Sequence, residues 1–171
     1  MTAAVKSGAF QLDRAGSTIA IRHKTMWGLV TVKGHFTTLS GGGEVRPDGT
    51  ATGTITVGSA SLDTKNAKRD THLRSADFLA VEEFPEIVYE VREVTPRGDA
   101  AVEVNGSLTV RGTTRPLALT ATVTEAGADT ATLTTEFTVD RQEFGLTLNP
   151  AGMMRGVTTV NAVLRFQRVS D

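Results

Sequence analysis

The stretch "VEVNGSLTVRGTTRPLALTATV", residues 102–123, decides the fold class. On both sides of its central "RGTTRP" (111–116), every second position is apolar, with Gly106 at one of these positions. Strict alternation of this kind is typical of β-strands that bury one face, and "RGTTRP" is a turn cluster that joins two of them. The alternation keeps its phase through Asn105-Gly106, so we expect one long strand over 102–110, bent at Gly106.

The same alternation extends outward along most of the chain. Turn clusters such as "RPDG" (46–49), "PRGD" (96–99) and "EAGAD" (125–129) separate the alternating runs. Short antiparallel strands joined by hairpins predict an all-β sandwich or a closed barrel. The expected strands are 18–23, 30–36, 52–57, 87–91, 102–110, 117–123, 133–139 and 157–166.

Composition limits the class of protein further. The 171 residues predict a single domain, 1–171, and a net charge of −1 argues against a nucleic-acid partner. Cysteine is absent, which excludes disulfides and thiol catalysis. No run approaches the roughly 18 apolar residues of a membrane span, so we do not expect a membrane-spanning protein. The first residues lack the apolar core of a signal peptide; we expect a cytoplasmic protein, or a secreted one if a leader has been removed.

One segment, "KRDTHLRSADFLAVEEFPEI" (68–87), interrupts the alternation with charges and aromatic residues. Asn66 can cap a helix that begins at Ala67, and Pro85 ends the helical stretch. Asp70 and Arg74 are one turn apart, in the order that favours an exposed ion pair. The sequence therefore predicts a helical insertion, about 66–85, between two strands.

This segment also carries a family resemblance. "RDTHLRSADF" (69–78), followed by "FPEI" (84–87), resembles the hallmark of the YceI-like family of lipocalin-like lipid-binding proteins. Residues 30–45, 104–119 and 140–145 resemble three further stretches of that family, in the family's order.

The resemblance implies an eight-stranded antiparallel lipocalin-like barrel, with the 66–85 segment at its side or mouth and an elongated apolar cavity. It also implies non-enzymatic binding, for transport or storage, of a polyisoprenoid, an isoprenoid quinone or a fatty-acid-like lipid. The expected partner is thus a long-chain isoprenoid or acyl lipid. A homodimer is compatible with the sequence.

Side-chain size supports a cavity. An eight-stranded barrel can either fill its interior with side chains or hold one small ligand. Aromatic residues make up only 5% of this chain, and the expected inward positions are mostly small. The alternative is a distorted barrel whose loops fold inward to complete an ordinary core. The expected apolar ligand contacts are Trp27, Phe36, Leu73, Phe78, Phe84, Phe144 and Met153.

A polar cluster accompanies these apolar residues, and two interpretations of it stay open. Its Arg and His donors could hold the head group of a ligand. The cluster could also be a structural ion network that pins the helix to the barrel, with Arg141 reaching a carboxylate such as Asp70. Its members are Arg69, Asp70, His72, Arg74, Asp140 and Arg141.

Catalytic and metal-binding motifs are missing from the sequence. There is no G-x-S-x-G motif, and the three histidines lack H-x-x-x-H spacing, so we expect no catalytic residue, no metal and no cofactor. His23 follows the apolar phase of its strand and is interpreted as a core histidine, whereas His35 follows the polar phase. Two alternative functions remain: an enzyme with Asp70 and His72 as an acid–base pair at the barrel mouth, and a haem-binding barrel with His23 or His72 as axial ligand.

Overall fold

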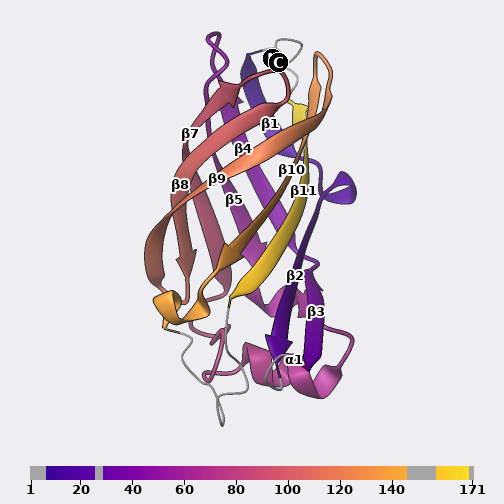
Figure 1. Ribbon diagram of the computed structural model, residues 1–171, viewed down its shortest axis with the longest axis vertical. Coiled ribbons are helices and arrows are strands. Elements are labelled where there is room, and N and C mark those ends of the chain that lie inside the picture. Colours follow the sequence, from indigo (N-terminus) through magenta and orange to yellow (C-terminus); the bar gives the residue numbers. More distant parts are fainter. Residues whose placement is uncertain (1–6, 26–28, 146–156, 170–171) are drawn as a thin grey trace.

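The computed structural model describes residues 7–25, 29–145 and 157–169. Strands dominate this part of the chain, and its one α-helix lies at one end of them (Figure 1). The strands are β1 (Gly8–Leu12), β2 (Thr18–Thr25), β3 (Val30–Phe36), β4 (Leu39–Val45), β5 (Ala51–Gly58), β6 (Leu62–Asp63), β7 (Glu86–Arg97), β8 (Ala101–Val110), β9 (Thr113–Ala126), β10 (Thr130–Val139) and β11 (Thr158–Arg168). The helix α1 covers Ala67–Arg74, and the 3-10 turns η1, η3 and η4 cover Arg14–Gly16, Ser59–Ser61 and Arg141–Phe144.

Eight of the strands close into an antiparallel barrel. Their order is β1-β4-β5-β7-β8-β9-β10-β11, and β1 pairs back with β11. Closure removes the exposed strand edges that an open sheet would present to solvent. The expected eight-stranded lipocalin-like barrel is therefore confirmed.

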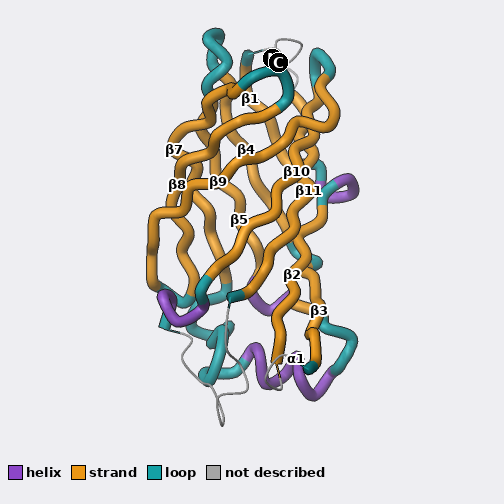
Figure 2. Tube along the Cα trace, viewed as in Figure 1, coloured by secondary structure: helices purple, strands orange, loops and turns teal. Residues whose placement is uncertain are grey.

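The hairpin of β2 and β3 extends the barrel wall at the end where α1 lies. The first part of β11 pairs with β2, as in Val163↔Thr18, and its last part pairs with β1, as in Phe166↔Leu12. β3 then pairs with β2 and with the short β6. Figure 2 shows α1 and η4 at this end of the molecule, which we call the helix end; the β4–β5 turn, residues 46–50, lies at the far end.

The sequence did not predict three of the strands, β1, β4 and β6. β4 contains Gly41, Gly42 and Gly43, and Val45 is its one β-branched residue, so little in its sequence marks a strand. The glycines are needed because β4 and β5 approach each other closely: a Cβ on Gly43 would collide with the backbone oxygen of Thr52. This close approach is a property of the pairing, which the sequence pattern does not reveal.

The long strand predicted over 102–110 is present as β8, and it runs through Gly106 without a turn. Opposite Gly106, the register of β7 shifts between Val91 and Glu93, which indicates a bulge on the neighbouring strand. Arg111 and Gly112, both with positive φ (50° and 74°), form the two-residue turn to β9.

Buried apolar residues form three clusters along the barrel wall. One centres on Leu39 and Val57, and a second on Val102 and Val104. The third, at the helix end, joins Phe78 and Phe144. Within the described ranges, no helix has the length and apolar character needed to cross a bilayer.

Candidate ligand-binding cavity

A cavity of about 820 Å³ lies inside the barrel. It extends from Gly43 and Glu44 on β4, near the far end, to His72 on α1 and Arg141 on η4 at the helix end. This volume is within the usual range of ligand-binding pockets, roughly 300–1,000 Å³.

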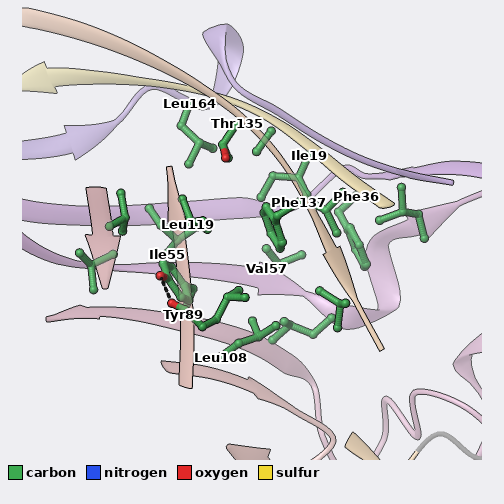
Figure 3. Close-up of a pocket in the computed structure, with 18 of the residues that line it drawn as sticks. Ile19, Phe36, Ile55, Val57, Tyr89, Leu108, Leu119, Thr135, Phe137 and Leu164 are labelled. Atoms are coloured by element: carbon green, nitrogen blue, oxygen red, sulfur yellow. Dashed lines mark hydrogen bonds between the residues drawn. The ribbon is translucent and has the colours of Figure 1, made fainter. Parts of the chain in front are cut away.

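The walls of the cavity are apolar, because the alternation along each strand turns one set of side chains inward. On β8, the inward set is Val102, Val104, Leu108 and Val110, as the sequence predicted. Figure 3 shows wall residues from several strands around the same space, among them Ile19, Phe36, Ile55, Val57, Leu108, Leu119, Phe137 and Leu164.

The helix end is closed by α1 together with the turn that follows it. Within α1, only Asp70 is buried. The helix begins at Ala67 and is capped by Asn66, as predicted, but it ends at Arg74 rather than at Pro85. The turns that follow bury Phe78, which packs with Phe144 of η4.

Polar contacts with Thr64 hold α1 in place. Thr64 donates from its backbone N–H (3.0 Å) and its hydroxyl (2.5 Å) to Oδ1 of Asp70. Arg69 donates to the hydroxyl and the carbonyl oxygen of the same Thr64, both at 2.8 Å. The expected exposed pair of Asp70 with Arg74 is wrong: Asp70 is buried against Thr64, and Arg74 donates to the carbonyl of Leu62. Helical spacing brings two side chains onto one face, but it does not show what else packs there.

His72 lies at the boundary between the cavity and solvent. Its Nε2 is 3.1 Å from Oδ2 of Asp77, and both side chains are exposed. The ring meets that of Phe78 edge to face, with centroids 5.0 Å apart. His72 therefore borders the cavity through its ring while its polar atom pairs with an exposed carboxylate.

Two basic side chains of the helix end, from different elements, line the cavity. His23, on β2, forms a hydrogen bond of 3.0 Å between Nδ1 and the Thr158 hydroxyl. Burial, followed by the nearby charge of Arg141, lowers the pKa of His23 from 6.5. Arg141 is buried, with 8% of its surface exposed, and this burial lowers the pKa of its guanidinium. His23 is therefore a cavity-facing residue and not only a core histidine.

The predicted site residues fall into three groups. Two lie outside the described residues, namely Trp27 and Met153. The cavity lining contains Phe36, Leu73, Phe78, Phe144, Arg69, His72 and Arg141. It does not contain Phe84, Asp70, Arg74 or Asp140.

The predicted residues outside the lining have structural contacts of their own. The Phe84 ring packs so closely on Gly112 that a Cβ there would lie 2.8 Å from it. The Asp140 carboxylate accepts a hydrogen bond of 3.0 Å from the Gln142 N–H and caps η4. These residues shape the helix end without bordering the cavity.

Tyr89 is a cavity residue that the sequence analysis did not single out. Its hydroxyl donates a hydrogen bond of 2.7 Å to the carbonyl of Leu117 (Figure 3), and burial raises its pKa to about 12. The alternation over 87–91 places Tyr89 on the same face as Ile87 and Val91, which was the available indication. Over the described part of the chain, no group of three His, Asp or Glu side chains is arranged to hold a metal ion.

Comparison with solved structures supports this architecture. BcnA of Burkholderia cenocepacia superposes with a TM-score of 0.81 at 19% identity, covering 90% of this chain and 98% of that chain. A polyisoprenoid-binding domain from Saccharophagus degradans, implicated in plant cell wall breakdown, gives 0.77 at 16% identity, with coverage of 94% and 98%. At these identities the likeness shows the fold alone.

Sequence comparison shows the family. A UPF0312 protein of Vibrio cholerae is 31% identical over 129 residues, 74% of this chain and 68% of that protein. A UPF0312 protein of Shewanella baltica is 33% identical with the same coverage. The family model of the YceI-like domain matches residues 10–166. The chain therefore belongs to the YceI-like family.

Proposed function

We propose that this protein binds one long apolar lipid, without covalent attachment, inside its barrel. The observation that carries the proposal is the cavity of about 820 Å³, whose strand walls are almost entirely apolar. The polyisoprenoid-binding domain of Saccharophagus degradans, which shares the fold, makes a polyisoprenoid or isoprenoid quinone the first candidate. A fatty-acid-like chain is the second. The physiological role would be transport or storage of that lipid.

Chain burial can supply the affinity. Each buried CH₂ group contributes about 0.8 kcal/mol, so a lipid with a few tens of carbons gains a large favourable term. Ordering the flexible chain offsets much of this gain. Because the walls offer few polar contacts, they would discriminate between lipids by the length and shape of the hydrocarbon chain.

The positions of Asp70 and His72 favour binding over catalysis. An acid–base pair must reach a substrate together. The Asp70 carboxylate is bound to Thr64 and is absent from the cavity lining. His72 contacts Asp77, on the exposed side. We therefore propose a protein without catalytic activity.

A cavity-filling substitution tests the proposal. Ala121, on β9, is buried and lines the cavity, whereas Ala118, on the same strand, is exposed. Ala121→Trp should abolish uptake of the apolar fluorophore phenylnaphthylamine and of lipids from vesicles, because the indole occupies the ligand's space. Ala118→Trp should bind as the wild type does.

Folding of each variant is checked by circular dichroism. If Ala121→Trp does not fold, Ala162→Phe fills the cavity from β11 instead. Uptake that persists in a folded cavity-filled variant, or a wild-type protein that takes up neither fluorophore nor lipid, would contradict the proposal.

A further inference from the structure

The polar groups of the cavity are distributed unevenly along its length. Arg69, His72, His23 and Arg141 all border its helix end. Among the described lining residues, the one acidic residue is Glu44, on β4 toward the far end, and it is exposed. A negatively charged or oxygen-rich group is therefore favoured at the helix end.

The Nε2 atom of His23 is buried without a hydrogen-bond partner among the described residues. The other ring nitrogen, Nδ1, is engaged with Thr158. Buried polar atoms in native proteins almost always have a partner, and one without a partner destabilises the fold. Because the ring borders the cavity, a group inside the cavity can supply the missing contact.

The chemistry of the pair indicates which group that is. Lowering the pKa of His23 favours its neutral ring near pH 7. When Nδ1 accepts the hydroxyl proton of Thr158, the neutral ring carries its hydrogen on Nε2 and acts there as a donor. Arg141 is a donor and a cation that burial has removed from water. A donor whose pKa is already lowered by burial and by a nearby buried cation suits, together with that cation, an anionic oxygen.

We propose that His23 and Arg141 form a head-group site for an anionic oxygen, carboxylate or phosphate, at the end of the lipid that fills the barrel. The hydrocarbon chain runs from this site toward the far end. Thr158 orients the His23 ring, and Arg69 adds positive charge at the same end. This inference rests on the proposed function, since it assigns the polar end of the same ligand.

Lipids with one chain and different head groups test the site. Oleate, oleyl phosphate and methyl oleate compete with phenylnaphthylamine for the wild type, for His23→Leu and for Arg141→Gln. The wild type should bind oleate or oleyl phosphate about tenfold to a hundredfold more tightly than the uncharged ester. Both variants should lose this preference and bind oleate, oleyl phosphate and methyl oleate with similar affinities. Whichever of the two anions shows the larger preference identifies the head group.

Control variants lie away from the cavity. His35→Leu changes a histidine outside the lining, and Arg14→Gln changes an exposed arginine of η1; both should keep the preference. If a site variant does not fold, NMR of carboxyl-labelled oleate bound to the wild type provides a second readout. A carboxylate bound at this site should give a single resonance at the chemical shift of an ionised carboxylate. A soluble paramagnetic agent should not broaden this resonance, because the site is enclosed.

The outcomes separate this inference from the proposed function. Binding of the fluorophore and of all three lipids with equal affinity would overturn the head-group site and leave the lipid-binding function standing; Nε2 would then bind only water. An unchanged preference in both folded variants would overturn it as well. Failure of the wild type to bind the fluorophore or any lipid would instead overturn the proposed function.

Discussion

The hydroxyl of Tyr89 on β7 reaches across β8 to the carbonyl oxygen of Leu117 on β9, at 2.7 Å. Gly106 makes this possible, because a Cβ there would lie 3.0 Å from the Tyr89 oxygen. The described pairing of β10 with β9 ends at Thr134↔Thr122, so the strands separate toward the helix end. Tyr89 thus supplies a hydrogen bond to β9 where β10 no longer runs beside it.

Removing that hydroxyl should destabilise the barrel. For Tyr89→Phe we expect the free energy of unfolding to fall by roughly 0.5–1.5 kcal/mol, because the Leu117 carbonyl loses its donor. Denaturant titration measures the loss. Thr122→Val removes an exposed hydroxyl from β9 and should change the stability by less than about 0.5 kcal/mol. Equal losses of stability in the two variants would show that the hydrogen bond from Tyr89 to Leu117 does not stabilise the fold measurably.

Asp70 should matter for stability rather than for ligand binding. Asp70→Ala leaves the N–H and hydroxyl of Thr64 without their buried acceptor, which should cost roughly 1–3 kcal/mol of unfolding free energy. Asp77→Ala breaks only the exposed contact with His72 and should cost less than about 1 kcal/mol. Folded Asp70→Ala protein should still bind phenylnaphthylamine. A variant that keeps full stability but loses binding would assign Asp70 to the ligand.

The lowered pKa of His23 predicts a pH dependence of stability. The unfolded chain protonates His23 near 6.5, whereas the folded protein does so only at lower pH. Between these two values the unfolded state binds more protons, so the free energy of unfolding falls as the pH drops from about 6.5. Above that pH the contribution of His23 is fully present.

Two measurements check this dependence. NMR titration of the His23 ring should give a midpoint below 6.5, and His23→Leu should flatten the decline of stability below that pH. A ring midpoint at or above 6.5 would mean that the ring is neither desolvated nor close to Arg141.

Hydrogen exchange distinguishes a mobile lid from a fixed plug at the helix end. Residues 66–85 are held to the barrel by a few polar contacts and by apolar residues such as Phe78, and part of the segment borders the cavity. We expect their amides to exchange faster than those of β8 and to slow when phenylnaphthylamine is bound, as is usual for low-stability elements beside a ligand. Equal protection with and without the fluorophore would indicate a fixed plug.

The sequence revealed the barrel wherever alternation was regular. β8 was predicted as one continuous strand, because Val102, Val104, Leu108 and Val110 keep one phase through Gly106. β4 was missed because three glycines replace the side chains that would mark it, although Leu39 and Val45 keep the phase. Alternation in the sequence indicates which side chains share a face of a strand. It does not indicate how closely two backbones approach, because that depends on which strands pair.

The candidate site was predicted in outline only. Aromatic residues in the 66–85 segment and in "DRQEFG" did gather at the helix end, as Phe78 and Phe144 show. The partner of Asp70 was missed, since Thr64 lies before the helix and its contact depends on how the chain enters α1. His23 was placed on the correct face, but its contact with Thr158 joins residues 135 positions apart, which no local pattern contains.

Native mass spectrometry of the protein purified from its own cells tests the central claim most directly. A long apolar chain enclosed in the barrel should survive gentle purification, because returning it to water costs about 0.8 kcal/mol per CH₂ group. We predict a protein mass increased by one lipid, released only on denaturation and identified as an isoprenoid or acyl species. A protein that is consistently free of lipid, and that also fails to extract such lipids from vesicles, would contradict the account.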